Sequence, residues 1–187
     1  EFDDRVARRC DDRLAAIRQA IEALAPEGRR LRILDIGCSL GYVSLSLAAD
    51  GHEVLGIDRQ PANVALARAL AAESGLAARF EVASLDESWL AGRDDGEFDL
   101  ALALSVLHHT VHEKGLARTQ RLVHRLLLRS RTVVAELALR REPLYWAASL
   151  PGDPLALFGR AAFVRELGRF ETHLSGIRRP LVFASNR

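Results

Sequence analysis

The feature that most constrains the fold of this chain is an alternation of short apolar runs with longer segments of helical periodicity. Five apolar runs have the composition of buried strands: 31–36, 52–57, 79–83, 98–104 and 132–137. Segments with helical spacing lie around and between them, at 3–24, 40–49, 61–74 and 115–128. Because repeated strand–helix units form a mostly parallel sheet covered on both faces, we predict a doubly wound α/β domain.

The last third of the chain departs from this alternation. The segment 140–154 is rich in loop-forming and aromatic residues, and a helix is predicted near 159–167. Two short strands, near 171–174 and 181–184, complete a predicted seven-stranded sheet. No domain boundary is visible, so residues 1–187 are expected to form a single domain. The chain contains no methionine, which favours a domain taken from a longer protein.

Composition and charge exclude several classes of function. The formal net charge is +1 and the basic residues are interspersed with acidic ones, so no nucleic-acid-binding face is predicted. The two cysteines, Cys10 and Cys38, form neither a disulfide framework nor a zinc motif, and no metal site is predicted. They fit a reducing, cytoplasmic setting. No apolar run is long enough to span a membrane.

Polar residues and glycines gather where the predicted strands end. In open α/β sheets, ligands bind at the carboxyl ends of the strands, where the strand order reverses. Gly37 allows a tight turn and close approach of the main chain to a ligand, and Gly41 lets the next helix start close to the sheet. Asp58 ends the second strand, where an acid can accept hydrogen bonds from ribose hydroxyls. Asp86 follows the third strand, where it could meet an adenine amino group.

The first turn indicates which nucleoside such a site would take. A dinucleotide-binding turn needs the pattern G-x-G-x-x-G, but Ser39 replaces its middle glycine here. Asp35, two residues before Gly37, would repel a pyrophosphate. The same carboxylate suits a ligand that carries a cationic sulfonium and an amino group.

Four segments together resemble the motifs of class I methyltransferases that use S-adenosylmethionine (SAM). LDIGCSLGYVSLSLA is similar to motif I, VLGID to motif II, VASLD to the adenine-loop motif and FDLALALSVLHH to motif IV. The resemblance implies a Rossmann-like fold in which the 35–41 loop cradles the amino-acid part of SAM and Asp58 binds its ribose. The cofactor-binding residues predicted in this way are Asp35, Gly37, Cys38, Ser39, Gly41, Tyr42, Asp58, Arg59, Ser84, Leu85, Asp86, Leu104 and Ser105.

A narrower resemblance reaches nearly to the C-terminus. GYVSLSLA, LSVLHHTVHEKG, EPLYWAASLPGDP, FETHLS and RPLVFASN are similar to the methyltransferase domain of bifunctional methyltransferase–kinases that terminate bacterial O-antigen polysaccharides. This likeness implies a glycan acceptor, either a sugar hydroxyl or a phosphate on a terminal sugar. It also implies further domains, and a cytoplasmic location at the inner face of the membrane through partners. A small-molecule methyltransferase of another metabolic class and a non-catalytic cofactor-binding scaffold are the alternatives.

The acceptor decides whether the reaction needs a base. A hydroxyl must lose a proton, whereas a phosphate is already anionic and needs cationic partners instead. The predicted catalytic residues are His108, His109 and Glu136: either histidine is a candidate base or, if protonated, a cationic clamp, and Glu136 is a candidate for orienting a histidine or holding the acceptor. Tyr145 and Trp146 suit stacking on a sugar, and packing within the loop is the competing interpretation.

Overall fold

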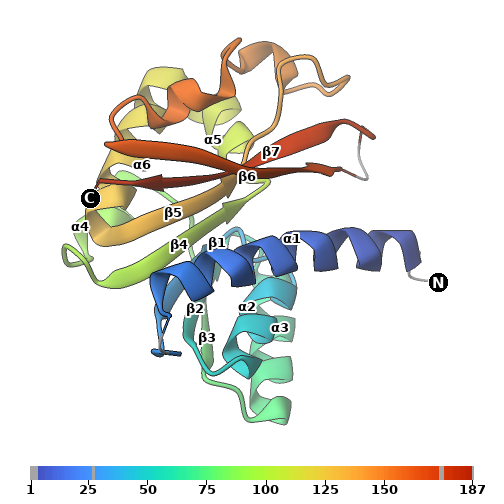
Figure 1. Ribbon diagram of the computed structural model, residues 1–187, viewed down its shortest axis with the longest axis vertical. Coiled ribbons are helices and arrows are strands. Elements are labelled where there is room, and N and C mark those ends of the chain that lie inside the picture. The colour runs from blue at the N-terminus through green and yellow to red at the C-terminus, as the bar shows by residue number, and fades with distance from the viewer. Residues whose placement is uncertain (1–3, 27, 173–174, 187) are drawn as a thin grey trace.

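The computed structural model describes residues 4–26, 28–172 and 175–186, and within them seven strands form one sheet (Figure 1). The strand order is β3-β2-β1-β4-β5-β7-β6. β1 to β5 are parallel, and β7 runs antiparallel to its neighbours β5 and β6. The strands are β1 (Arg32–Ile36), β2 (Glu53–Asp58), β3 (Ala78–Val82), β4 (Phe98–Leu104), β5 (Ser130–Glu136), β6 (Phe163–Glu171) and β7 (Arg178–Ser185). The predicted doubly wound α/β fold is confirmed.

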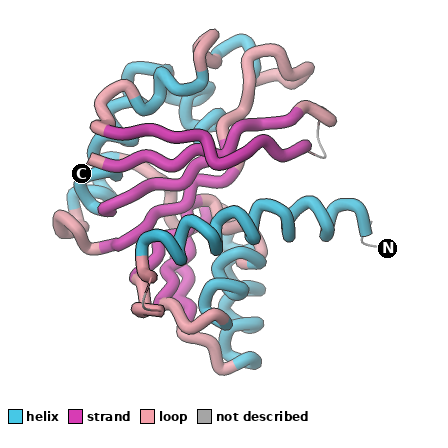
Figure 2. The backbone as a smooth tube through the Cα atoms, viewed as in Figure 1, coloured by secondary structure: helices cyan, strands magenta, loops and turns pink. Residues whose placement is uncertain are grey.

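Helices cover both faces of the sheet (Figure 2). α1 (Asp4–Leu24), α2 (Tyr42–Ala49) and α3 (Pro61–Ser74) pack on one face. The other face carries α4 (Glu87–Ala91), α5 (Leu107–Lys114), α6 (Leu116–Arg129) and the short 3₁₀ helices η1 (Ala147–Ser149) and η2 (Pro154–Phe158). Because both faces are covered, the central strand β4 is buried almost throughout, as its continuous apolar run predicted.

The residues predicted to begin and end α3 do so in the structure. Pro61 stands in its first turn, where a missing N–H group costs nothing. Gly75 ends it with a left-handed backbone (φ 63°), a conformation that glycine adopts without strain. β2, the strand before α3, ends at Asp58. Because Pro61 marks where α3 begins, it also marks where β2 must end, and so locates the Asp58 carboxylate at the carboxyl end of that strand.

The predicted helix near 159–167 is wrong. Residues 163–171 form β6, which pairs with β7 from Phe163 opposite Ser185 to Glu171 opposite Arg178. β6 is an edge strand in which no residue is fully buried, so its sequence lacks a strong alternating pattern and long-range pairing decides its conformation. The strand predicted at 181–184 lies inside β7, whereas of 171–174 only Glu171 is in a strand, and 173–174 lie outside the described residues.

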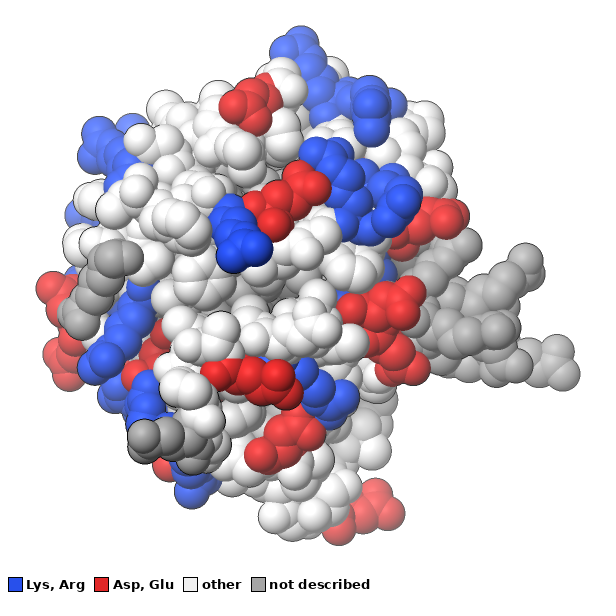
Figure 3. Space-filling model, viewed as in Figure 1, with Lys and Arg blue, Asp and Glu red and all other residues white. Residues whose placement is uncertain are grey.

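Charged side chains of both signs alternate over the surface in view, where no large area of one sign appears (Figure 3). None of the described helices is both long and apolar enough to cross a membrane.

Candidate functional site

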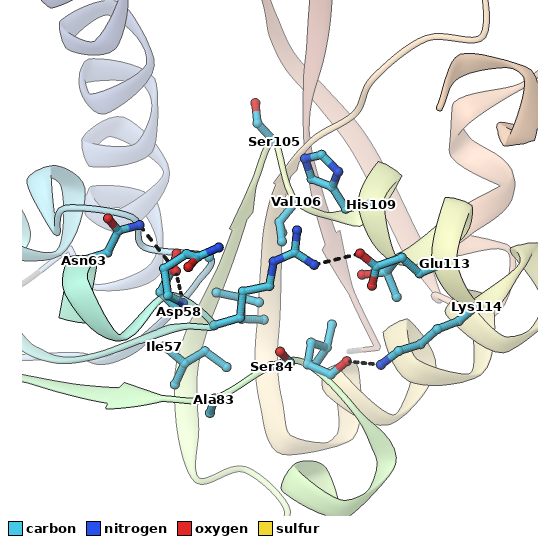
Figure 4. Close-up of a pocket in the computed structure, with 16 residues that line it drawn as sticks. Ile57, Asp58, Asn63, Ala83, Ser84, Ser105, Val106, His109, Glu113 and Lys114 are labelled. Carbon is cyan, nitrogen blue, oxygen red and sulfur yellow. Dashed lines mark hydrogen bonds and ion pairs between the residues drawn. The ribbon is translucent and has the colours of Figure 1, made fainter. Parts of the chain in front are cut away.

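A cavity of about 290 Å³ opens where the strand order reverses between β1 and β4. Its walls come from the carboxyl ends of β1, β2 and β4, from the loop after β3 and from α3 and α5 (Figure 4). This volume is close to the lower end of the range for small-ligand sites, about 300 Å³. The lining residues are Ile36, Gly37, Ile57, Asp58, Arg59, Gln60, Asn63, Ala83, Ser84, Leu85, Ser105, Val106, His109, Thr110, Glu113 and Lys114.

Asp58 is held at the cavity wall by main-chain amides. Its Oδ2 accepts a hydrogen bond from the Ser39 amide at 2.9 Å, and its Oδ1 accepts one from the Gln60 amide at 2.8 Å. The side-chain amide of Asn63 lies 3.5 Å from Oδ1 (Figure 4). A carboxylate has about four lone-pair positions, so these bonds orient Asp58 and leave acceptor capacity for a ligand.

The 35–41 loop brings bare main chain to the cavity. Gly37 has a φ of 69°, and a Cβ atom there would lie 2.9 Å from Cγ2 of Val106. Any side chain at this position would therefore displace Val106, which also lines the cavity. Ser39 takes a left-handed φ of 51°, a conformation that is strained for a residue with a side chain. The Ser39 amide donates a hydrogen bond to Asp58, so the strained backbone occurs at a residue that positions this carboxylate.

Asp35 lies behind this loop, outside the cavity lining. Burial raises the pKa of its carboxyl to about 6, although a hydrogen bond from Ser44 Oγ at 2.6 Å to Oδ2 lowers it and the nearby Asp58 raises it further. A cationic group at the adjacent end of the cavity would favour the ionised form. The arrangement suits a ligand with an ammonium group.

Ser84 and Leu85 line the cavity as predicted for an adenine site, but Asp86 does not. The Asp86 carboxylate caps α4, accepting hydrogen bonds from the Trp89 amide at 2.8 Å and from Ser88 Oγ at 2.7 Å. These bonds, the Trp89 amide first, lower its pKa. Its adenine contact stays a prediction, with helix capping as its role in the structure.

Several residues predicted for the cofactor lie outside the lining. Cys38 is buried against Phe80, and burial raises the pKa of its thiol to about 12, so it is no nucleophile. The Tyr42 hydroxyl donates to Asp11 of α1. Leu104 packs on the core face that α1 covers. Ser39 and Gly41 are also absent from the lining, although the Ser39 amide holds Asp58.

Of the two candidate histidines, only His109 faces the cavity (Figure 4). His108 is buried between His109 and Trp146, with ring centroids 4.1 and 4.3 Å away. Burial, with the neighbouring His109 and Arg179, lowers the pKa of His108 to about 3. Burial also lowers the pKa of His109, followed by the charge of Arg59. Both imidazoles are therefore neutral near pH 7, and His109 is the one able to meet a ligand.

A buried ionic network supports the cavity from the side of β5 and β7. The Ser105 hydroxyl, which lines the cavity, donates to Oε1 of Glu136 at 2.6 Å and accepts from Nη1 of Arg179 at 3.1 Å. Arg179 is fully buried and binds both carboxylate oxygens of Glu142, at 2.9 and 2.7 Å. Arg13 of α1 pairs with the other oxygen of Glu136. Glu136 thus reaches the cavity through Ser105.

Sequence reasoning missed Arg13, Glu142 and Arg179, because their partners are distant in the chain. It also missed Glu113, which forms an ion pair of 2.7 Å with the predicted Arg59 beside the cavity. One signal pointed to Glu113: it follows His109 by four residues, which places both on one helix face. Among the residues that the structure describes, no group of three His, Cys, Asp or Glu side chains is placed to hold a metal ion.

Comparison with known proteins supplies the family. A family model described as a methyltransferase domain matches residues 33–129, which carry the cavity-forming ends of β1 to β4. The chain belongs to the methyltransferase domain family. This agrees with the resemblance of its motifs to class I methyltransferases.

This methyltransferase domain is 45% identical over 188 aligned residues to the O-antigen chain terminator bifunctional methyltransferase/kinase WbdD of Escherichia coli. The alignment covers 100% of this chain and 26% of that protein, so the chain spans about a quarter of its relative's length. A ubiquinone biosynthesis O-methyltransferase of Azorhizobium caulinodans is 40% identical over 46% of this chain and 32% of its own.

Solved structures agree with these sequence relatives. A crystal structure of WbdD matches with a TM-score of 0.91 and 44% identity, covering 95% of this chain and 40% of that one. A SAM-dependent methyltransferase from Methanosarcina mazei matches with a TM-score of 0.59 and 20% identity, over 83% of this chain and 91% of that one. The second likeness shows the common fold alone.

Proposed function

We propose that this domain uses SAM to methylate an oxygen at the end of a bacterial surface polysaccharide, either a terminal sugar hydroxyl or a sugar phosphate. The observation that best supports SAM as the cofactor is the position of the Asp58 carboxylate. Two main-chain amides hold it at the wall of a cavity, at the point where the strand order reverses. The likeness to an O-antigen chain terminator, which covers all of this chain and 26% of that protein, supports the glycan acceptor.

In this proposal, different residues of the cavity would contact the ribose, the adenine and the amino-acid part of SAM. Asp58 would accept hydrogen bonds from the ribose hydroxyls, and Ser84 and Leu85 would lie against the adenine. Gly37, whose missing side chain leaves main chain exposed to the cavity, would approach the amino-acid end, beside Asp35. When bound, SAM supplies a methyl group on a positively charged sulfur.

The chain's own task is to hold and prepare the acceptor. Orientation of the reacting groups contributes roughly 7–11 kcal/mol in such displacements. For a hydroxyl acceptor, the neutral His109 would take the proton from the oxygen as it attacks, and a positioned base is worth about 10²–10⁴-fold in rate. For a phosphate acceptor no proton must leave, and Arg59 and Lys114 would supply positive charge.

The proposal places this reaction in a longer, cytoplasmic protein. Residues 1–187 would form its methyltransferase domain, and other domains or partners would bring it to the inner face of the membrane. The alignment to a bifunctional relative about four times as long supports this arrangement.

Calorimetric titration tests the cofactor. We expect SAM and its demethylated product to bind in the micromolar range, and Asp58→Ala to abolish measurable binding. Asp12→Ala is the matched control, because Asp12 is an exposed aspartate on α1 outside the cavity lining. Absence of binding by the unaltered protein would overturn the active-methyltransferase proposal and favour the scaffold alternative.

Methyl transfer then separates the acceptors. With a sugar hydroxyl as acceptor, His109→Gln should lower kcat by about 10²–10⁴-fold. With a phosphorylated sugar end the same variant should lose only a few-fold, because no base is needed. Transfer to a small molecule and to no glycan would instead support the small-molecule alternative, in line with the partial likeness to a ubiquinone biosynthesis O-methyltransferase.

A further inference from the structure

Tyr145 is an aromatic residue that the fold leaves in the open. Its relative exposure is 73%, the highest of the large exposed hydrophobic residues that the structure describes. The next residue, Trp146, has the opposite placement, with 2% exposure in the core beside His108. Of the two interpretations of these aromatic residues, packing therefore applies to Trp146, whereas the Tyr145 ring remains accessible for stacking.

The segment that carries Tyr145 is fixed on both sides. The Ala147 amide donates to the Leu144 carbonyl at 2.9 Å, and the Ser149 amide donates to the Trp146 carbonyl at 3.0 Å. The Tyr145 ring meets the His112 ring at 82°, with centroids 5.2 Å apart. Nδ1 of His112 is in turn 3.0 Å from Ser149 Oγ. Neighbouring groups thus hold the main chain beside Tyr145 and contact its ring, which lowers the entropy cost of binding to it.

This ring lies outside the cavity lining, near residues that belong to it. His112 belongs to α5 and precedes Glu113, which lines the cavity and pairs with Arg59 (the dashed line at Glu113 in Figure 4). The Glu113 hydrogen bond raises the pKa of Arg59, and Tyr145 is among the nearby groups that raise it further. Tyr145, His112, Glu113 and Arg59 therefore lie near one another beside the cavity, and this group is here called the Tyr145 rim.

The Tyr145 rim combines two kinds of contact. An open aromatic face gains by covering apolar C–H groups. The guanidinium of Arg59 offers several N–H donors, and the Glu113 carboxylate offers acceptors. A sugar ring has the matching surfaces, with C–H groups on its face and hydroxyls around its edge. A purely apolar ligand would leave the charged pair unused, and a free anion would leave the aromatic face unused.

We propose that the Tyr145 rim is a subsite for a sugar ring of the acceptor, with the ring stacked on Tyr145 and its hydroxyls bound by Arg59 and Glu113. The inference rests on the proposed function and adds the residues that select a glycan. Tyr145 contacts the substrate at a distance from the reacting atoms, so it governs acceptor affinity rather than the chemical step.

Steady-state methyl transfer to a panel of hexose mono-, di- and trisaccharides, each with and without a terminal phosphate, tests this subsite. Tyr145→Ala should raise the acceptor KM about five- to tenfold and leave kcat within twofold. Tyr145→Phe should restore the KM, because it keeps the ring face. The calorimetric Kd for SAM should be unchanged in both variants, which also reports that they fold.

The matched control is Phe163→Ala, which removes another exposed aromatic ring at the opposite, amino-terminal end of β5. An unchanged acceptor KM in Tyr145→Ala, with the unaltered protein active on a sugar, overturns the subsite and leaves the proposed function standing. If Tyr145→Ala leaves the acceptor KM unchanged and weakens association with a partner domain, the subsite is likewise overturned and the proposed function stands. SAM binding without transfer to any sugar of the panel overturns both the glycan acceptor and the subsite.

Discussion

The two sides of the cavity are held together in different ways. On the side of β1 to β3, main-chain groups orient the Asp58 carboxylate, which accepts hydrogen bonds from the amides of Ser39 and Gln60, 19 and 2 residues away. On the side of β5 and β7, side chains hold one another across long stretches of sequence. Glu136 binds Ser105 and Arg13, which are 31 and 123 residues away.

The main-chain contacts around Asp58 can be made by many sequences, whereas the side-chain network around Glu136 requires particular residues. Main-chain amides are available in any sequence, so the side of β1 to β3 needs only a few glycines and acids in the right places. The network of Ser105, Glu136, Glu142 and Arg179 works only as a set, because a buried charge without its partner is costly. The residues matched by the general family model, 33–129, end before β5 and contain only Ser105 of this set.

The largest effect is expected from breaking the network. Arg179→Leu would leave Glu136 and Glu142 buried with too little positive charge, which should lower the free energy of unfolding by about 3–5 kcal/mol. Denaturant unfolding measures this. The double variant Arg179→Leu/Glu142→Leu should recover part of the loss. If Arg179→Leu were as stable as the parent protein, the four residues of the network would not depend on one another as described.

On the side of β1 to β3, Asp58→Asn should weaken SAM binding and also lower stability. Asn has one accepting oxygen and one NH2 group, so it keeps only one of the two main-chain hydrogen bonds that hold Asp58. The change also removes the charge, and one charge-assisted hydrogen bond is worth about 1.5–3 kcal/mol, so the Kd for SAM should rise about 10- to 150-fold. Calorimetry gives the Kd, with Asp12→Asn as the control. An unchanged Kd for SAM in Asp58→Asn would contradict the ribose contact proposed for Asp58.

Asp35 predicts a pH dependence of SAM affinity. Its pKa is about 6 in the free protein, and the ammonium group of SAM should lower it. Binding then releases a proton below pH 6, so affinity should rise with pH, at most about tenfold per unit, and level off above pH 6. Calorimetry at pH 5, 6 and 7 in two buffers of different ionisation enthalpy detects the proton. The Asp35→Asn variant should show neither effect.

The smallest effect concerns the backbone at Ser105, whose φ is 53°. Ser105→Ala removes the hydroxyl and keeps the strain, whereas Ser105→Gly removes both. We expect the glycine variant to be more stable than the alanine variant by about 1 kcal/mol, since only glycine adopts this conformation freely. Thermal unfolding compares the pair, and the reverse order would show that the backbone at Ser105 is unstrained.

The same contrast explains what the sequence predicted. Asp58, Gly37, Ser84 and Leu85 follow strands that are recognisable from local composition, and they line the cavity. Arg179 could not be assigned, because it meets Glu142 only once β7 has paired beside β5. Asp86 shows the limit of local reasoning: the same residue type at a strand end suits a ligand contact or a helix cap, and the bond to the Trp89 amide makes it a cap here.

The antiparallel pair β6 and β7 has a consequence for how the protein is made. β7 is the last strand in the described chain but the second to last in the sheet, and β6 pairs with no other strand. During synthesis, β6 therefore leaves the ribosome before the only strand that can hold it, and the edge of β5 stays open until the two arrive as a hairpin. The network of Glu136, Glu142 and Arg179 is therefore completed after the loops that follow β1 to β4 have been translated.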